Sequence, residues 1–443
     1  MRWLACLFVL FVVGCAPAPA PQAALELAEP ALPHIALESV VQNLDYTLTK
    51  DAQERFAAAY RQKHFGIWQQ RIRSDWSWAV QVARKNPGIG ENLLPNDAEW
   101  IETLIANANL ESAPTWQAAI VVADSPLRQM PTHKPYFLPA TIAGEGYPFD
   151  NWQNSAIFAS TPVIVERKSV DGAWLLVQAS FVAGWIESRN VAFVRKNDQE
   201  HMRSLAMFVP TNDDVALHSA SGQWLDGARV GKVFVGQAGK GGIVAQIPQR
   251  GADGFVVWAK TKPTQQLQSF PLHFTQQNVQ TIAAQLLGEK YGWGGLLGNR
   301  DCSAMLRDFW SSFGLWLPRN SGAQAQVAQG EALELGAYTP HEKERLIIEK
   351  GRAWGSLLWL SGHIVLYVGE VEQKAIVFHS LWGLRVLEGA HESRAVIGRS
   401  ILSDLWLGQE LPHRVPDMLL IDRIATMRTL FAPDDIQTKE ETP

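Results

Sequence analysis

Cysteine is scarce in this sequence, which has three in 443 residues. Residues 1–14 are predicted to be a leader that is removed, so that Cys15 and Cys302 remain. If Cys15 carries a lipid, Cys302 has no partner for a disulfide. An unpaired thiol is a liability in an exported, oxidising compartment unless the protein uses it. The scarcity of cysteine therefore makes Cys302 a candidate functional residue.

The N-terminal apolar run, residues 3–13, is too short to span a bilayer. It follows Met1-Arg2 and is typical of a secretory signal. The sequence Val12-Val-Gly-Cys15 resembles a lipobox, which implies that Cys15 is acylated and followed by an Ala/Pro tether over residues 15–34. The alternative is an ordinary signal peptide that is cut later.

The expected location follows from this leader. Ala16 stands where lipoproteins of this kind carry an Asp when they are retained at the inner membrane. We therefore expect a protein anchored to a membrane in the cell envelope, on the periplasmic face of the outer membrane if the source is Gram-negative.

An excess of positive charge is also missing. Lys and Arg number 39 against 44 Asp and Glu, for a net charge of −5. A nucleic-acid-binding protein would need a basic patch, so no nucleic-acid partner is expected. What the chain does have is 47% hydrophobic residues, enough for three or so packed domains, and 18 Trp, most of which are expected in the core.

The patterning predicts a multidomain α+β chain. Apolar residues at helical spacing predict a helical N-terminal segment, which is expected to embrace the other domains. Two cycles of short β-rich runs then predict two small β-barrels, with one larger β-sandwich as the alternative. Turns are expected at Asp171-Gly172, Asp226-Gly227 and Asp253-Gly254. The predicted boundaries are 35–112 for the helical segment, 115–200 and 203–264 for the barrels, 263–271 for a linker, 272–432 for the last domain and 433–443 for a disordered tail.

The sequence from Tyr291 to Trp310 is a glycine-rich loop that runs into a helix. Asp301 is a good N-cap residue, so Cys302 is predicted in the first helical turn. There the free backbone N–H groups and the helix dipole favour a thiolate, which is the nucleophilic form. The alternative is a small buried cysteine without a chemical role.

Two histidines are the candidate partners of Cys302. Residues 361–369 and 375–379 alternate like strands, and a hairpin with a five-residue loop over 369–373 would place His363 directly opposite His379. One imidazole would then act as base for Cys302 and the other would orient it. A slip of one residue on one strand would destroy this pairing.

These motifs together resemble the NlpC/p60 family of cell-wall cysteine peptidases. The resemblance rests on Tyr-x-Trp-Gly-Gly, Asp-Cys-Ser, Leu317-Pro-Arg-Asn-Ser321 with Gln324 behind it, Gly-His, and a second His on the next strand, and it covers residues 275–430. It implies a papain-like catalytic domain, preceded by two bacterial SH3-like barrels and a helical clamp. The implied activity is cleavage of the bond between γ-D-glutamate and a diamino acid, meso-diaminopimelate, in murein stem peptides.

The resemblance also implies the catalytic roles. Cys302 would be the nucleophile, His363 the general base and acid, and His379 the residue that orients His363. Two positions depart from the family pattern: Ala304 replaces a usual Gly, and Val365 stands where Gly is common.

The implied substrate contacts lie around the nucleophile. Trp293 would line the cleft, Asp301 would hold the ammonium of a free L-Ala, and Ser303 and Ser321 would contact the D-Glu portion. In relatives a Tyr of the first SH3 domain grips the amine. Phe181 stands near that position here, so this hydroxyl contact is missing and the selection is expected to be weaker than in those relatives. In relatives the first SH3 domain also walls off one end of the cleft, so the resemblance still implies a strong preference for a free L-Ala amino end over one acylated by muramic acid.

Other interpretations stay open. Metal binding by Cys302 and the two histidines is disfavoured because structural zinc needs four ligands, so no metal and no cofactor is expected. A related amidase that separates sugar from peptide is a second enzymatic possibility. A non-catalytic, wall-binding lipoprotein is the third.

Overall fold

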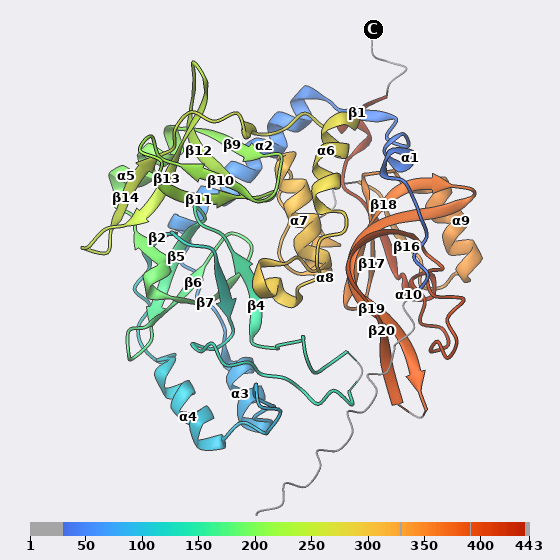
Figure 1. The fold of residues 1–443 in the computed structure, drawn as a ribbon, viewed down its shortest axis with the longest axis horizontal. Coiled ribbons are helices and arrows are strands. Elements are labelled where there is room, and N and C mark those ends of the chain that lie inside the picture. The colour runs from blue at the N-terminus through green and yellow to red at the C-terminus, as the bar shows by residue number, and fades with distance from the viewer. Residues whose placement is uncertain (1–29, 143, 328–329, 390, 439–443) are drawn as a thin grey trace, which may run out of the picture.

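The computed structural model describes residues 30–142, 144–327, 330–389 and 391–438. The chain runs from helices through two β-rich units to a mixed domain of helices and strands, as the colours of Figure 1 show. This confirms the multidomain α+β prediction with two separate β-rich units ahead of the last domain. Within the described residues, no helix has the length and apolar character needed to cross a membrane. The predicted leader and Cys15 lie outside the described residues.

The N-terminal segment is mostly helical but contains one strand. Its elements are α1 (Leu37–Val41), β1 (Tyr46–Leu48), α2 (Lys50–Gly66), the 3₁₀ helix η1 (Ile67–Gln69), α3 (Ser77–Lys85) and α4 (Ala98–Asn107). Three hydrogen bonds tie it to the other three domains: the Trp68 indole donates to Ala119 O, Arg61 donates to Leu205 O, and the Trp354 indole donates to Val40 O. The segment therefore embraces the molecule, as the clamp interpretation predicts.

The expectation of a disordered tail is wrong for residues 433–438. A 3₁₀ helix, η4 (Pro433–Asp435), leads into β22 (Ile436–Thr438), which pairs antiparallel with β1. Asp435 is only 2% exposed, accepts a hydrogen bond from the Ala432 N–H and pairs with Arg55. Asp435, which was predicted to belong to a solvated tail, is therefore buried and partnered. Residues 439–443 lie outside the described part.

The first β unit is one seven-stranded sheet with the order β4-β3-β7-β6-β5-β2-β8. Its strands are β2 (Gln117–Val121), β3 (Ser125–Arg128), β4 (Gln153–Ile157), β5 (Pro162–Lys168), β6 (Trp174–Gln178), β7 (Ala183–Glu187) and β8 (Val191–Phe193). The predicted Asp171-Gly172 turn joins β5 to β6, because Gly172 has φ 74° and Asp171 accepts a hydrogen bond from Ala173 N–H.

The second β unit has its own sheets, so a single larger sandwich is not what the chain forms. Helix α5 (Lys196–Ser204) leads into a five-stranded sheet ordered β14-β13-β12-β9-β15 and a β10-β11 hairpin. The strands are β9 (Ala206–Pro210), β10 (Val215–His218), β11 (Trp224–Ala228), β12 (Phe234–Gly239), β13 (Gly242–Arg250), β14 (Val256–Lys260) and β15 (Leu267–Ser269).

Two details of this unit correct the sequence predictions. Asp226-Gly227 is not a turn but lies inside β11, where the Asp226 carboxylate pairs with the buried Lys232. The predicted linker contains β15, which pairs with β9 because Leu267, 1% exposed, belongs to the core of this unit. The second β unit therefore extends beyond its predicted end at residue 264 and includes β15. The Asp253-Gly254 turn is confirmed by the φ of 82° at Gly254 and its hydrogen bond to Gly251 O.

The C-terminal domain is a six-stranded sheet, ordered β16-β21-β17-β18-β19-β20, with helices on both faces. Its elements are α6 (Gln276–Leu286), the 3₁₀ helix η3 (Trp293–Gly298), α7 (Cys302–Ser312), α8 (Ser321–Gln324), β16 (Ala332–Glu334), α9 (Pro340–Lys350), β17 (Ser356–Leu360), β18 (His363–Val371), β19 (Lys374–Glu388), β20 (His391–Asp404), α10 (Leu420–Arg423) and β21 (Thr426–Thr429). Helices α6 and α7 cover one face and share a core with it, whereas α9 and α10 cover the other.

Helix α7 lies at the centre of the molecule, between the sheet and the N-terminal segment (Figure 1). Phe309, Trp310 and Phe313 are each 0% exposed and pack with Phe56 of α2 and Phe378 of β19 in one core. Burial on all sides is what a helix with apolar residues all round requires. The start of α7, where Cys302 lies, is thereby fixed by several elements at once.

Candidate active site

Cys302 is the first residue of α7 and is 8% exposed. The Asp301 side chain caps the helix by accepting a hydrogen bond of 2.9 Å from the Ala304 N–H, as predicted. The backbone N–H of Ile364, near the start of β18, lies close enough to the thiol to act on its pKa in the lowering direction. A helix start and a strand start thus hold the sulfur between them.

The glycine-rich loop before Cys302 is pressed against the first β unit. Gly294 and Gly295 in η3 have φ of 57° and 79°, and a Cβ on Gly294 would lie 2.2 Å from Gln153 O in β4. The Gln153 amide also donates to Gly294 O at 2.9 Å. Glycine is needed here both for the backbone conformation and for the close approach. The first β unit therefore forms one wall beside the nucleophile.

The pKa of the Cys302 thiol is raised to about 12, first by burial and then by the Asp301 carboxylate. The expectation that the helix start would favour the thiolate is therefore wrong for this structure. Burial disfavours the charged form by more than the helix dipole and the N–H groups favour it. The nucleophile rests as a neutral thiol.

Asp301 has its own cation. Arg319 donates from both Nη atoms to the two carboxylate oxygens, and both side chains are almost fully buried. The remaining acceptor positions take hydrogen bonds from Ser303 Oγ and the Gly294 N–H. The Arg319 guanidinium therefore already neutralises this carboxylate, and it holds the pKa of Asp301 below its usual value despite burial. The contact between Asp301 and a substrate ammonium stays a prediction.

His363 and His379 are joined in a chain of hydrogen bonds that ends at Ser403. His363 Nε2 lies 3.0 Å from His379 Nδ1, and His379 Nε2 lies 3.1 Å from Ser403 Oγ. The Ser403 hydroxyl donates its one proton to Asp404 O at 2.9 Å, so it must accept from His379 Nε2–H. A neutral His379 then accepts at Nδ1 from His363 Nε2–H. This leaves the lone pair of a neutral His363 on Nδ1.

Both imidazoles are neutral at ordinary pH. Burial, and then the charge of Arg423, lower the pKa of His363 to about 4. Burial and the neighbouring His363 lower the pKa of His379 well below its usual value. A neutral base beside a neutral thiol can take the thiol proton as the sulfur attacks.

In the described part of the chain, no group of three or more His, Cys, Asp or Glu residues has a metal-binding arrangement.

The two histidines meet through a different hairpin from the predicted one. The loop is not five residues over 369–373 but a two-residue turn, because Val371 pairs with Lys374. Glu372 and Gln373 form this turn with φ of 52° and 64°. Two positive φ values define the type I′ turn, which Asn-Gly favours far more than Glu-Gln does. The sequence therefore carries no clear signal for it.

A β-bulge at Val368 brings the histidines to the same face of the sheet. The pairing shifts by one residue there, so that Leu366 pairs with Phe378. His379 is one step beyond Phe378 and lies diagonal to His363, not directly opposite as predicted. Without the bulge, the turn would set the two imidazoles on opposite faces, because side chains alternate along a strand.

The predicted substrate contacts are arranged around Cys302 in different ways. The Trp293 indole donates to Asp150 O at 3.2 Å, which ties it to the first β unit. Ser303 is 5% exposed, and its hydroxyl belongs to the Asp301 network. Ser321 begins α8, is partly exposed, and its hydroxyl has no hydrogen-bond partner among the described residues. Phe181 lies under the Arg307 guanidinium, further along α7 than the nucleophile.

Three further residues of this site belong to the sequence motifs named above but had no predicted role. Arg319 pairs with Asp301, as described. The Gln324 amide donates to Ser303 O and Pro318 O, both at 2.8 Å, and so fixes the first turn of α7. Burial, then the charges of Asp301 and Cys302, raise the pKa of Tyr291 well above its usual value, so its hydroxyl stays a proton donor near the thiol. Each of these three residues belongs to a sequence motif, but only the folded structure shows which group it interacts with.

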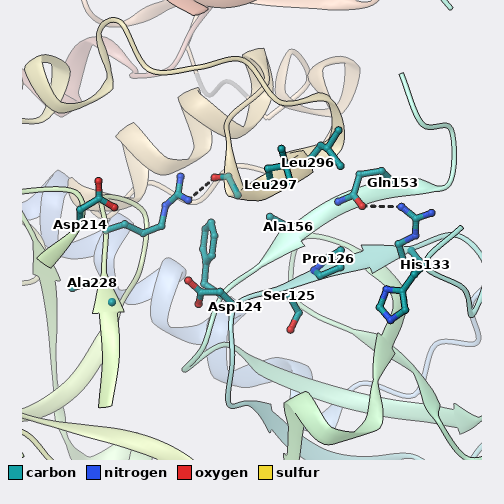
Figure 2. A pocket seen from close by; sticks show the side chains of 16 residues that line it. Asp124, Ser125, Pro126, His133, Gln153, Ala156, Asp214, Ala228, Leu296 and Leu297 are labelled. Atoms are coloured by element: carbon teal, nitrogen blue, oxygen red, sulfur yellow. Dashed lines mark hydrogen bonds between the residues drawn. The ribbon is translucent and has the colours of Figure 1, made fainter. Parts of the chain in front are cut away.

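A separate cavity of about 580 Å³ lies behind the Trp293 loop, between the two β units. Figure 2 shows Gln153 and Ala156 of β4 on one side, with Leu296 and Leu297 of the loop beside them. Cys302, His363 and His379 do not line it. The cavity therefore belongs to the junction of the domains and not to the catalytic residues.

Four family models match successive parts of the chain. Residues 4–112 match the N-terminal stabilising domain of NlpC/P60 proteins, residues 135–187 an SH3 domain of the SH3b1 type, residues 198–234 an SH3 domain of the SH3b2 type, and residues 288–387 the NlpC/P60 family itself. The last match includes Cys302, His363 and His379. A comparison with curated proteins finds no match.

Solved structures are similar to this chain over most of its length. An NlpC/P60 endopeptidase from Photobacterium damselae subsp. piscicida superposes with a TM-score of 0.79 at 22% identity, over 91% of this chain and 97% of the other. An NlpC/P60 family protein from Bacillus cereus has a TM-score of 0.45 at 14% identity, over 71% of this chain and 99% of its own. The first of these likenesses shows the fold, and the models show the family. The chain belongs to the NlpC/P60 family, and its C-terminal domain is that of a cell-wall peptidase.

Proposed function

We propose that this protein is a murein endopeptidase that cleaves the γ-D-glutamyl bond to a diamino acid, with Cys302 as nucleophile. The observation that carries the proposal is the hydrogen-bonded chain from His363 through His379 to Ser403, beside a thiol at a helix start. That chain leaves the His363 Nδ1 lone pair free to act as a base. Nucleophile, base and orienter are the three parts that acyl transfer needs.

In the proposed reaction the Cys302 sulfur attacks the γ-carbonyl carbon while His363 Nδ1 takes the thiol proton. The oxygen becomes an oxyanion, and we propose that the Cys302 N–H and the Tyr291 hydroxyl donate hydrogen bonds to it. As the C–N bond breaks, His363 returns the proton to the leaving amine, and a thioester remains. Water, deprotonated by His363, hydrolyses the thioester and the thiol is restored.

The proposed substrate has a free amino end on L-Ala. We infer that the first β unit closes one end of the cleft, because its β4 packs on Gly294 and the ring of Phe149 lies edge-on to that of Trp293, with centroids 5.3 Å apart. A muramic acid on the L-Ala nitrogen would need room where this wall stands. Because Asp301 is already paired with Arg319, we attribute the selectivity to this wall more than to a new ion pair.

Product analysis tests the proposed bond. Purified murein and free L-Ala-γ-D-Glu-diaminopimelate are digested with the full chain and with Cys302→Ser, and products are identified by mass spectrometry. New amino termini on the diamino acid support the proposal. Release of intact stem peptides would show an amidase, and no products from either substrate would show a non-catalytic wall protein.

The N-acetylated tripeptide is the control for the amino end. We expect its kcat/KM to be at least about tenfold below that of the free tripeptide, because the acyl group collides with the β4 wall. Equal rates would show that the wall leaves the cleft open.

We also propose that Cys15 carries a lipid that anchors the protein in the cell envelope, on the outer membrane if the source is Gram-negative. The lipobox-like sequence before Cys15 supports this. Cys15→Ala should move the protein from the membrane fraction to the soluble fraction. A variant that stays with membranes would contradict the anchor.

A further inference from the structure

Three arginines lie close to one another outside the residues assigned above, and one of them, Arg423, lies near His363. Arg385 of β19 and Arg394 of β20 are directly paired across the two strands. Arg423, the last residue of α10, donates to Ser361 O at 2.8 Å, two residues before His363. Burial, and next the charge of Arg385, lower the pKa of both Arg394 and Arg423, which places the three guanidiniums within electrostatic reach of one another. We call them the arginine cluster.

Among the described residues, the arginine cluster has fewer carboxylate partners than guanidinium groups. Arg385 pairs with Glu392 at 2.5 Å, and Arg394 reaches the same carboxylate at 4.0 Å. Among the described residues, Arg394 and Arg423 have no other carboxylate at ion-pair distance. In the described part of the chain, three positive charges thus share one negative charge, and like charges opposed across strands destabilise a sheet. All three side chains are partly exposed, so an anion from solution can reach them.

The arginine cluster reaches the neighbourhood of His363 through Arg423. His363 gives its proton to the leaving amine, so the leaving residue must lie on the His363 side of Cys302. Trp293, Asp301 and Ser303 belong to a different part of the domain, the 3₁₀ helix η3 and the residues around the start of α7. The cluster is connected to the His363 side through the hydrogen bond of Arg423 to Ser361.

We propose that the arginine cluster binds a carboxylate of the leaving diamino acid. This deepens the proposed function and rests on it. A diaminopimelate leaving group carries one carboxylate on its α-carbon and a second at the far end of its side chain, next to an ammonium. Guanidinium groups bind carboxylates through two parallel hydrogen bonds, and Glu392 stands beside them to accept from the ammonium. Lysine at the same position lacks the second carboxylate.

The test measures kcat/KM on four tripeptides, L-Ala-γ-D-Glu-X, in which X is diaminopimelate or lysine and the C-terminus is free or amidated. The variant is Arg394→Gln, which leaves the Arg385–Glu392 pair in place. Arg394→Lys keeps the positive charge but not the two parallel N–H donors of a guanidinium. Its kcat/KM should fall between those of the wild type and Arg394→Gln. Arg399→Gln is the matched control, since Arg399 is exposed on the same strand and has no ion pair among the described residues. Thermal unfolding checks that each variant is folded.

We expect the wild type to prefer diaminopimelate over lysine by about tenfold, the value of one charge-assisted contact, and Arg394→Gln to remove this preference. If the variant loses rate on diaminopimelate alone, the side-chain carboxylate is the ligand. If it loses rate on every free C-terminus and on no amidated one, the α-carboxylate is the ligand. Unchanged or uniformly lowered rates in a folded Arg394→Gln overturn the subsite while the proposed function stands. A wild type that cuts none of the four overturns the proposed function itself.

Discussion

Arg319 and Asp301 form a buried ion pair directly beside the nucleophile. Their side chains are 5% and 9% exposed, and the carboxylate also caps α7. Removing Arg319 would leave a buried, unpaired carboxylate next to the thiol. Arg319→Ala should therefore lower the free energy of unfolding by about 3–5 kcal/mol, measured by chemical denaturation.

The control for this substitution is Arg345→Ala. Arg345 pairs with Glu349 at 3.9 Å, but both side chains are more than half exposed. Pairs of this kind contribute little, so the loss should be under about 1 kcal/mol. Similar losses in the two variants would show that Arg319 has no special role.

The raised pKa of Cys302 predicts how its reactivity depends on pH. Because the pKa lies near 12 and above the usual 9, the thiolate fraction at pH 7 is smaller than in a free thiol, and it grows with each pH unit up to and beyond pH 9. The rate of alkylation by iodoacetamide should therefore rise steadily over this range. An inflection between pH 4 and 7 would instead reveal a preformed thiolate–imidazolium pair.

The residue types at the site could be predicted from the sequence, but their charge states could not. Cys302 at a helix start, and two histidines on neighbouring strands, follow from local patterns. The protonation of the thiol depends on how much water the fold excludes. The partner of Asp301 is Arg319, which lies 18 residues further along the chain, and no local sequence pattern predicts that ion pair.

At the scale of elements, the β18–β19 hairpin shows what periodicity cannot predict. Alternation identified both strands and the face that carries the histidines. The turn at Glu372-Gln373 and the bulge at Val368 change the register twice, and together they keep both imidazoles on one face. Neither has a distinct sequence signal, so the predicted direct opposition was wrong although the predicted contact is present.

The contact between η3 and β4 provides a prediction at the same scale. In Gly294→Ala the new Cβ would meet Gln153 O at 2.2 Å, in a backbone conformation with φ 57° that alanine rarely adopts. We expect a loss of about 2–4 kcal/mol in the free energy of unfolding and a lower kcat, because the loop that leads to Cys302 must shift.

Gly298→Ala is the matched control for this contact. Gly298 has φ 76°, but its nearest neighbour, an Arg229 guanidinium nitrogen, is 3.6 Å from the added Cβ. This variant carries the backbone strain without the collision. If both variants lose the same stability and activity, the approach of β4 has no role in positioning the loop.

At the scale of the whole molecule, the two ends of the chain meet. Strand β1 pairs with β22, and Arg55 of α2 pairs with Asp435 of η4. Asp435→Ala should lower the free energy of unfolding by about 1–3 kcal/mol, because the Ala432 N–H loses its acceptor and Arg55 its partner. Asp434→Ala, at an exposed neighbour, should leave the melting temperature within error. Equal effects would mean that the ends are held by other contacts.

The order of the domains could be predicted from texture alone, since helical spacing, short β runs and a glycine-rich motif follow one another. Their contacts could not. Asp435 looked like part of a solvated tail, and Leu267 like part of a linker, because the strands that pair with these segments are remote in the sequence.

The central claim is that Cys302 forms a thioester with the γ-carboxyl of the D-Glu residue. Its most direct test is rapid quenching of the full chain in acid during turnover of L-Ala-γ-D-Glu-diaminopimelate, followed by mass spectrometry of the protein and its peptides. We predict an added L-Ala-D-Glu acyl group on the peptide that contains Cys302, and no adduct and no turnover in Cys302→Ser. Turnover that persists in Cys302→Ser, or an acyl group on another residue, would contradict the account.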